Sequence, residues 1–332
     1  MSTTPDHAEV TRLLETAALA SLRAPSVFNT QPWRWRIAGD TLELSADRDR
    51  GLPATDAEGR LLLVSCGTAL HHARTALAAA GHRTEVTRLP DPDRPDRLAL
   101  IRVAGSAPAG PEVAAMAEAI PRRRTDRRAY GDRPVPDELL TELRHRVEAE
   151  GASLHVVRPD QVPALAVAAD RAAAAEQDDP AYAAELHAWS NRPAGSGDGV
   201  PAETAVEPSL RRVPVRDFAP GGTAGLTAGA GHDRGAAYVL IFGRTDRPID
   251  LLRGGEGLSA LLLTATAHGL ASEPLSESAE VAWSRTMLRG LLAGIGEPYL
   301  AVRLGYLDSP EPPPAAPRRD PAEVIVIEGR RP

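Results

Sequence analysis

Two stretches of this 332-residue sequence, separated by a constant offset of 188 residues, narrow the choice of fold more than any other feature. In each copy, a long apolar segment with helical periodicity ends at a glycine and leads to a possible strand. The matched pairs are Gly67 with Gly255, Leu70 with Leu258, Ala79 with Ala267, Gly81 with Gly269, and Glu85 with Glu273. Five identities in 19 positions are weak support in a chain rich in Ala, Gly and Leu. Their positions nevertheless favour a duplicated unit of helix and strand.

Hydrophobic periodicity predicts helices and strands along most of the chain. Helices are expected at 6–23, 57–80, 111–121, 136–150, 160–190, 249–270 and 278–293, with a break near Pro180. Strands are expected at 33–37, 42–45, 84–89, 98–104, 154–157, 236–242, 299–304 and 324–327. The mixture indicates a chain built from both kinds of element.

Two segments lack this periodicity. Residues 191–235 hold nine Gly and five Pro in 45 positions, and residues 308–321 hold six Pro in 14 positions. A long structureless loop is usually a lid, a binding loop or a disordered insertion, and these alternatives stay open for 191–235. Its glycines and prolines leave few ways to bury apolar surface, so we expect it to have no core of its own. The proline-rich tail must be extended.

The charged residues exclude several classes of function. The chain has 38 arginines and no lysine, which excludes a P-loop lysine, a Schiff-base lysine and an anchor for pyridoxal phosphate. A net charge of −7 favours neither nucleic acid nor an anionic membrane as a partner. Cys66 is the only cysteine and cannot form an intrachain disulfide. An N-terminus without an apolar run and the lack of a long apolar segment predict a cytoplasmic protein.

Most of the remaining motifs favour structural roles. Residues 255–260 fit a loose G-x-G-x-x-A pattern, but they lie within a predicted helix, so close helix packing is expected. His71 and His72 are adjacent on a helix and point about 100° apart, which disfavours a shared metal ion. The sequence contains neither G-x-S-x-G nor H-E-x-x-H. We therefore name no catalytic side chain and no metal ligand.

The segment Ala24-Pro-Ser-Val-Phe-Asn-Thr-Gln-Pro-Trp33 stands out. It lies between a predicted helix and a predicted strand, and it combines small hydroxyl and amide side chains with two prolines. One interpretation is a well-made turn in which Trp33 anchors the core. The other is a polar wall around a planar heteroaromatic ligand, because amides and turn backbone groups match ring nitrogen and oxygen atoms.

Arginines gather in a second segment, Pro121-Arg-Arg-Arg-Thr-Asp-Arg-Arg-Ala-Tyr130, with five arginines in seven positions. Guanidinium groups are costly to crowd together without an anion, and they match phosphate oxygens in a bidentate way. The segment is therefore either a solvated basic face or a phosphate site. Arg318 and Arg319, which follow the prolines of the tail, form a second possible phosphate clamp.

These residues also resemble a known family. The segment 24–33 is similar to the flavin-proximal motif of the nitroreductase family of FMN proteins. Arg123-Arg-Thr-Asp-Arg127 resembles the Arg-Arg-Ser-x-Arg phosphate motif of that family, with Thr in place of Ser. Gly269-Leu-Ala-Ser-Glu-Pro-Leu275 resembles its Gly-Leu-x-Ser-x-Pro-Ile loop, and Gly305-Tyr-Leu resembles its late Gly-Tyr strand end. Together these motifs span most of the chain.

The order of the motifs resembles the Acg-like branch of the family, in which one polypeptide mimics a homodimer. Here the arginine motif follows the Ala-Pro-Ser motif by about 100 residues, whereas ordinary members have the reverse order in a shorter chain. The resemblance implies an α+β fold with a mixed, largely antiparallel sheet flanked by helices, duplicated within the chain. The first half would be 1–110. The second would be 111–332, including a lid-like loop at 191–235 and the extended tail.

Carried over by position, the resemblance implies which residues bind FMN. The phosphate and ribityl chain would be held by Arg123, Arg124, Thr125, Arg127, Arg318 and Arg319. The isoalloxazine ring would be lined by Pro25, Ser26, Asn29 and Gln31, with Pro274, Leu275 and Ser276 near its N5 and O4 atoms. The family's common Glu-Gly is Ser276-Glu277 here, and the larger Glu277 side chain would narrow access to the ring.

The resemblance also implies a function. NAD(P)H would reduce FMN at N5, and a nitro, quinone or similar electron-poor acceptor would then take two electrons. The alternatives are a flavin-binding or flavin-sequestering protein with little turnover, and a scaffold without a cofactor. In the sequestering alternative, 191–235 is a lid, with Trp189, Asp198 and Asp217 as contacts. The expected partners are NAD(P)H and a small acceptor, without nucleic acid or membrane, in a monomer or homodimer.

Overall fold

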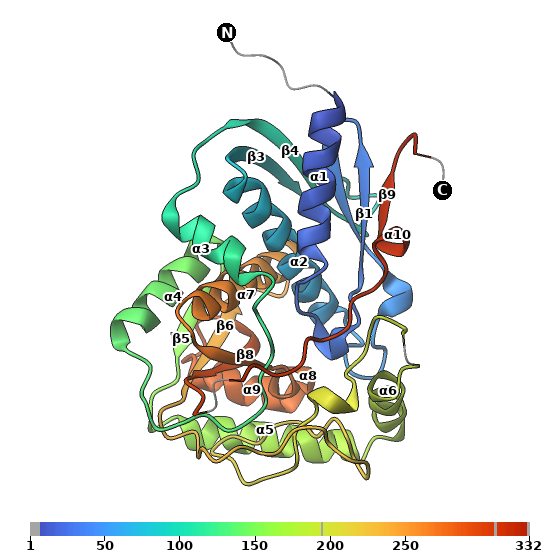
Figure 1. The fold of residues 1–332 in the computed structure, drawn as a ribbon. Helices are drawn as coiled ribbons and strands as arrows, with labels where there is room; N and C mark the ends of the chain where they lie inside the picture. The colour runs from blue at the N-terminus through green and yellow to red at the C-terminus, as the bar shows by residue number, and fades with distance from the viewer. Residues whose placement is uncertain (1–6, 194, 309–310, 331–332) are drawn as a thin grey trace.

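The computed structural model describes residues 7–193, 195–308 and 311–330 (Figure 1). The helices in these ranges are α1 His7–Ser21, α2 Arg60–Ala79, α3 Pro111–Ala119, α4 Asp137–Ala149, α5 Val162–Gln177, α6 Pro180–Ser190, α7 Pro248–Ala267, α8 Glu277–Glu280, α9 Ala282–Leu291 and α10 Pro321–Val324. The strands are β1 Trp33–Ala38, β2 Thr41–Ala46, β3 His82–Arg88, β4 Arg97–Ser106, β5 Ser153–Val156, β6 Ala237–Gly243, β7 Ala271–Leu275, β8 Glu297–Gly305 and β9 Ile325–Ile327.

Most of these elements lie where the periodicity predicts them. The predicted helix at 160–190 is divided into α5 and α6, because Pro180 begins a new helix. The predicted helix at 278–293 is also divided, since Val281 is extended (φ −86°, ψ 126°) between α8 and α9. The sequence contains no proline or glycine at that point, so the second break was not predicted.

The strands form two sheets. The first has the order β3-β4-β2-β1-β9 and the second has the order β5-β6-β8-β7. Neighbouring strands are antiparallel throughout, except that β9 runs parallel to β1. Helices α1 and α2 pack on the first sheet, and α4 and α7 pack on the second (Figure 1). The predicted α+β fold with largely antiparallel strands is confirmed, with two sheets in place of one.

The two sheets repeat one topology. When β1, β2, β3 and β4 are matched with β5, β6, β7 and β8, the strand order and the antiparallel pairings are the same. In each set, a 20-residue helix connects the second strand to the third. The bounds of α2 and α7 differ by 188 residues at both ends, which is the offset found in the sequence. Gly81 and Gly269 follow these helices with left-handed φ values of 84° and 75°.

Helices α2 and α7 pack against each other where the two sheets meet (Figure 1). A methyl group on Gly67 would overlap the carbonyl oxygen of Leu252, and one on Gly255 would overlap that of Val64. The two contacts are reciprocal, because Gly67 and Val64 precede Gly255 and Leu252 by 188 residues. Reciprocal contacts of this kind are typical of a two-fold axis. Glycine is required at both positions because the backbones approach so closely.

His71 and His72 lie in the same interface. The Nδ1 atoms of both rings are 2.8 Å from Oγ of Ser259, which is 188 residues after His71. Burial lowers the pKa of His71 to about 3, so its ring is neutral at physiological pH. The structural role predicted for this histidine pair is confirmed.

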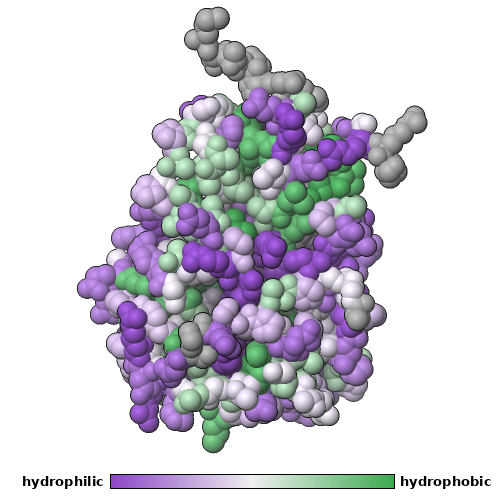
Figure 2. All heavy atoms as spheres, in the orientation of Figure 1, coloured by the Kyte–Doolittle hydropathy of each residue, from purple (hydrophilic) through white to green (hydrophobic). Residues whose placement is uncertain are grey.

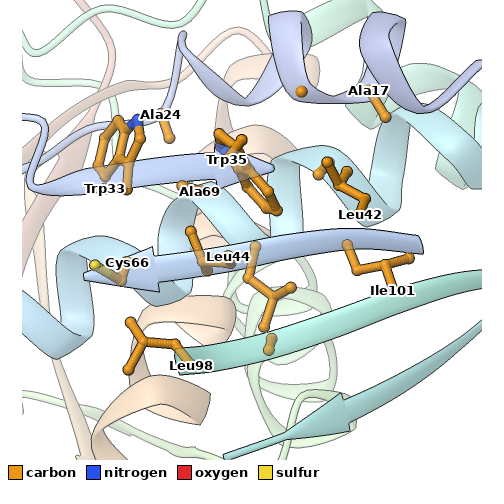
Figure 3. Packing of buried hydrophobic residues seen from close by; sticks show 14 of the residues in the cluster. Ala17, Ala24, Trp33, Trp35, Leu42, Leu44, Cys66, Ala69, Leu98 and Ile101 are labelled. Carbon is orange, nitrogen blue, oxygen red and sulfur yellow. The ribbon is translucent and has the colours of Figure 1, made fainter. Parts of the chain in front are cut away.

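Each sheet has its own apolar core. The first core lies between α1, α2 and the strands β1, β2 and β4, and it contains Trp33 and Trp35 at 0% and 1% exposure (Figure 3). Trp33 is therefore the core anchor that one interpretation of its segment expected. Cys66 is buried in the same cluster. The second core lies between α4, α7, β6 and β8.

Residues 195–235, called the long loop below, pack into an apolar cluster that they share with other segments. Val200, Ala205 and Phe218 of this loop are buried in an apolar cluster with Phe28 and Tyr182. The rings of Phe218 and Phe28 meet edge to face, with centroids 5.8 Å apart. The long loop therefore has no core of its own, as expected, because α6 and the segment after α1 supply its apolar partners.

The described part of the tail, 311–330, crosses the molecule from the second sheet to the first, where β9 pairs with β1 (Figure 1). Figure 2 shows apolar side chains gathered at the end of the molecule that holds α1 and β9. Leu19 of α1 and Val326 of β9 are exposed. Among the described residues, no helix combines the length and apolar character needed to cross a membrane.

Candidate functional site

Two adjoining cavities lie where the segment after α1, the arginine segment and the long loop meet. The first, the arginine pocket, spans about 690 Å³, part of it open to solvent, and is lined by Arg23, Arg123, Arg124, Arg127 and Arg318. The second, the apolar pocket, spans about 680 Å³, also partly open to solvent, and its apolar lining includes Val27, Leu61, Val64, Phe218, Leu258 and Leu300. Both cavities are lined by Pro25, Ser26, Phe28, Thr125 and Arg127. They are therefore two parts of one site.

The wall that both cavities share has an uncommon backbone. Within the segment after α1, three non-glycine residues have positive φ: Phe28 (50°), Asn29 (54°) and Gln31 (50°). Oγ of Ser26 accepts a hydrogen bond from the Gln31 N–H at 2.9 Å, and Oγ1 of Thr68 in α2 donates to the Pro25 carbonyl at 2.7 Å. Such strained segments persist only where their surroundings hold them, and they cluster at ligand sites.

Two amide side chains of this segment join it to distant parts of the chain. Nδ2 of Asn29 donates to the carbonyl of Gly199 in the long loop and to that of Pro317 in the tail, both at 3.0 Å. Nε2 of Gln31 donates to the carbonyl of Gly197 at 2.8 Å. The segment therefore positions the long loop and the tail around the arginine pocket.

Positive charge in the arginine pocket has no counter-charge in the lining. Among the described residues, no Asp or Glu lines this pocket. Burial lowers the pKa of Arg123 to about 10, and the charge of Arg124 adds to the effect. The pKa of Arg318 is lowered to about 9, mainly by burial and next by repulsion from Arg123. Cations that are destabilised by burial and by one another indicate a site for an anion.

Arg123 gives the clearest indication of what this anion is. Its side chain is buried, and within the described structure its Nε and Nη1 atoms have no hydrogen-bond partner. Buried polar atoms are normally hydrogen bonded. Arg318 lies at the same pocket and is held by Asn29, whose Oδ1 accepts from its Nη1 at 2.6 Å. Phosphate oxygens would supply the missing acceptors, so the residues present fit a phosphate group.

The apolar pocket is built on one face of α2. The residues of this helix that line it are Leu61, Val64, Ser65 and Thr68, which recur at positions i, i+3, i+4 and i+7 of one helix face. The end of β7 and the residue after it contribute Pro274 and Ser276. An apolar cavity with a few polar atoms is typical of sites for planar organic ligands.

Charged side chains also face the apolar pocket. Glu273 lines it and is ion-paired with Arg303 at 2.7 Å. Glu277 lines it with an Oε1 atom that has no hydrogen-bond partner in the described structure, while its Oε2 lies 3.9 Å from Nη2 of Arg216. Burial raises the pKa of Glu277 to about 7, opposed by Arg216. This carboxyl group can therefore carry a proton near neutral pH.

A buried ion network supports the arginine segment. Arg303 of β8 donates through Nη1 to both carboxylate oxygens of Asp233 at 2.7 Å, and it pairs through Nη2 with Glu273. The Arg303 guanidinium lies 4.1 Å from the ring centroid of Tyr130, and the Tyr130 N–H donates to Asp233 at 2.7 Å. The network joins β8, the long loop and the arginine segment.

Ten of the thirteen residues predicted to bind FMN line the two cavities. They are Pro25, Ser26, Asn29, Arg123, Arg124, Thr125, Arg127, Pro274, Ser276 and Arg318. The other three lie behind the lining. The Arg319 N–H donates to Oε1 of Gln31 at 3.1 Å, and Nη1 of Arg319 is 3.5 Å from Asp47. Leu275 is buried in a core cluster of the second sheet.

The residues expected to contact the flavin from a lid also lie elsewhere, since Trp189, Asp198 and Asp217 line neither cavity. Asp198 accepts from Nε of Arg192 at 2.7 Å and is also paired with Arg50. The same two guanidinium groups lie against the Trp189 ring. Asp198 therefore ties the long loop to Arg50, which follows the strand β2.

Sequence reasoning missed several residues of the lining. Ser65 and Thr68 are polar residues three positions apart on a buried helix face, and that pattern could have identified them. Phe28 occupies a variable position of its motif. Arg216 comes from the long loop, and no local pattern singles it out as a residue of the lining.

Comparison with known proteins places this site in context. No family model matches the chain. A Mycobacterium tuberculosis protein with the provisional name NAD(P)H nitroreductase Rv3131 is 40% identical over 330 residues, which cover 98% of this chain and 93% of the relative. The M. tuberculosis Acg protein, with the same provisional function in its name, is 36% identical over 329 residues, which cover 98% and 99%.

Solved structures of low similarity were also found. A nitroreductase with bound FMN from Bacteroides fragilis has a TM-score of 0.37 and 15% identity, covering 59% of this chain and 90% of that one. A nitroreductase with bound FMN from Desulfitobacterium hafniense has a TM-score of 0.37 and 14% identity, covering 60% and 93%.

Proposed function

The chain belongs to the nitroreductase family, in the branch that includes Acg, and from this premise we propose that it is an FMN-dependent oxidoreductase. NAD(P)H is its electron donor, and a nitro, quinone or similar electron-poor compound is its acceptor. The observation that carries the proposal is the arginine pocket, whose described lining contains no carboxylate, opening into an apolar pocket. One pocket suits a phosphate and the other suits a flat ring system.

When bound, FMN supplies the two-electron chemistry, and the protein supplies binding and orientation. Arg123, Arg124 and Arg318 hold the phosphate, while Thr125 and Arg127 hold the ribityl chain where the two pockets join. The ring is lined by Pro25, Ser26, Pro274 and Ser276. Phe218 closes one side of the apolar pocket, with the Arg127 guanidinium 4.3 Å from its ring centroid. Excluding water in this way strengthens the electrostatic interactions inside the site.

The flavin absorption spectrum tests the function. We expect purified protein to bind FMN and the flavin band to bleach when NADH or NADPH is added without oxygen. A protein that takes up no FMN contradicts the proposal. A protein that binds FMN but does not bleach with either donor supports the second candidate function, a flavin-holding protein.

One observation favours that second candidate. The long loop covers the apolar pocket with Arg216 and Phe218, and both side chains are largely buried. If Arg216 and Phe218 keep the nicotinamide away from the flavin, the wild type should not bleach. Phe218→Ala should then allow bleaching. Leu210→Ala changes a fully exposed residue of the same loop, and it is the control that should leave bleaching as it is.

We also propose that the chain is an internal pseudo-dimer. The shared strand order, the equal offsets of α2 and α7, and the reciprocal glycine contacts support it. The boundary predicted between 110 and 111 separates β4 from α3. The strand β9 pairs with β1 across that boundary, so the tail of the second half joins the sheet of the first.

The pseudo-dimer predicts an equivalent position for a second site. Charged side chains that pair with one another fill that position. The 188-residue offset relates Thr68 and Ser276, which line the apolar pocket, to Glu256 and Arg88. Glu256 is fully buried and accepts from Nε and Nη2 of Arg88 at 2.7 and 2.8 Å, and from Nη1 of Arg74 at 2.6 Å. This ion network supports a single flavin site per chain.

We therefore expect one FMN per chain. The measurement compares flavin released by denaturation with protein concentration, and chromatography identifies the flavin. A ratio of two, or FAD in place of FMN, would contradict the pseudo-dimer with one filled position.

From the sequence we also predict a cytoplasmic location, a monomer or homodimer, and a small electron-poor molecule as the acceptor.

A further inference from the structure

Three buried carboxyl groups surround one arginine beside the apolar pocket. Nη2 of Arg216 lies 2.6 Å from Glu280, 3.4 Å from Glu176 and 3.9 Å from Glu277. All four side chains are less than a tenth exposed. One guanidinium cannot neutralise three carboxylates in a buried cluster, so the cluster has to hold protons.

The cluster lies between two cavities. Glu277 faces the apolar pocket. Glu176 and Glu280 line a separate, open cavity of about 500 Å³, together with Thr55 and Asp179. Glu277 and Glu280 belong to α8, Glu176 belongs to α5, and these two helices pack against each other. The three carboxyl groups therefore surround the Arg216 guanidinium between the outer cavity and the apolar pocket.

Two of the three carboxyl groups have pKa values that burial raises to neutral pH or above. Burial raises the pKa of Glu176 to about 9, opposed by Arg216 and reinforced by the charge and hydrogen bond of Glu280. The charged groups that face Glu277 are Arg216 from the long loop, Glu280 from its own helix, Glu273 from β7 and Arg127 from the arginine segment. The pKa of Glu277 is raised to about 7, so its neutral form is present below that pH and is lost above it.

We propose that Glu277 donates a proton to the acceptor in the apolar pocket, and that Glu280 and Glu176 return the proton from the outer cavity. The proposal rests on the proposed function. A quinone, for example, gains one hydride from the reduced flavin and one proton from Glu277, which together give the hydroquinone. The Glu277 O–H bond breaks, an O–H bond forms on the acceptor oxygen, and a carboxylate remains. Water in the outer cavity then supplies a proton through Glu176 and Glu280.

Infrared difference spectra of the ligand-free protein test the acid without any flavin. We expect the carbonyl band of a protonated carboxylic acid to titrate near pH 7 and to vanish in Glu277→Gln. Glu297→Gln removes a carboxylate that pairs with Arg289 away from both cavities, and it should keep the band. A band that is unchanged in Glu277→Gln overturns the proposal, whatever the flavin does.

Stopped-flow oxidation of the reduced flavoprotein by a quinone gives the second readout. Glu277→Gln should slow this step on the order of a hundredfold, as expected for loss of a general acid. It should also remove the fall in rate above about pH 7 that we expect of the wild type. Glu176→Gln should slow only repeated turnover, because it acts on return of the proton. Equal rates in wild type and Glu277→Gln overturn the proposal. Failure to bind FMN would instead overturn the proposed function and leave the infrared result standing.

Discussion

Arg123→Ala is expected to weaken FMN binding about 10- to 150-fold, because a charge-assisted hydrogen bond to phosphate contributes about 1.5–3 kcal/mol. The Arg123 side chain is buried at the arginine pocket, with two nitrogen atoms unpartnered among the described residues. A flavin fluorescence titration measures the effect. Riboflavin lacks the phosphate, so it should bind the variant and the wild type equally well. A parallel loss of riboflavin affinity would show that the substitution disturbs the whole site.

The matched control is Arg122→Ala. Arg122 belongs to the same segment, is exposed, and donates through Nε to the Glu118 carbonyl at 3.1 Å. Its removal should leave the FMN dissociation constant unchanged. From the sequence, Arg128 is an equally good control, but its Nε and Nη2 donate to the buried Asp126 at 3.0 and 2.7 Å. Equal weakening by Arg122→Ala and Arg123→Ala would mean that the segment is only a basic surface.

The elements were predictable from the sequence where local patterns decide the structure. Helices α2 and α7 have apolar residues at helical spacing and are each followed by a glycine, Gly81 and Gly269, and the structure confirms both helices. The order of the strands within the sheets was harder to predict from the sequence. The strand β9 joins β1 in parallel, although the two lie at opposite ends of the chain. Such a pairing depends on the path of the tail across the molecule, which no local periodicity encodes.

The residues of the site could be predicted from the sequence where one short segment brings several of them to the cavities. The segment after α1 and the arginine segment contribute most of the predicted residues that line the cavities. Gln31 shows the limit of this reasoning, since its amide lies in the same motif but joins the long loop and the tail behind the lining. A motif indicates that a residue matters and does not separate contact with a ligand from support of the wall.

The residues that were missed come from segments without a pattern of their own. Arg216 lies in a loop rich in glycine and proline, and its position depends on partners from α5 and α8. The carboxyl groups around Arg216 are spread over 105 residues of sequence, from Glu176 to Glu280. Nothing in their local sequence distinguishes them from solvated acids, and only the fold brings them together.

Asp233→Ala is expected to lower the free energy of unfolding by about 3–5 kcal/mol, because it leaves a fully buried arginine without its main partner. Asp233 and Arg303 are both 0% exposed and share two hydrogen bonds at 2.7 Å. Urea denaturation followed by circular dichroism measures the change. Glu297→Gln breaks the more exposed pair with Arg289, and as a control it should cost about 0–1 kcal/mol.

The same substitution should also weaken FMN binding, through the arginine segment. Asp233 accepts the Tyr130 N–H, and Arg303 lies over the Tyr130 ring and donates to the Arg128 carbonyl at 3.0 Å. Loss of this support should let the segment shift, so affinity and stability should fall together in Asp233→Ala. Asp233→Asn keeps an acceptor oxygen and the size of the side chain but removes the charge. Its affinity for FMN and its free energy of unfolding should lie between those of Asp233→Ala and the wild type. If Asp233→Ala costs no more stability than Glu297→Gln, Arg303 has found another partner and the network does not hold the arginine segment in place.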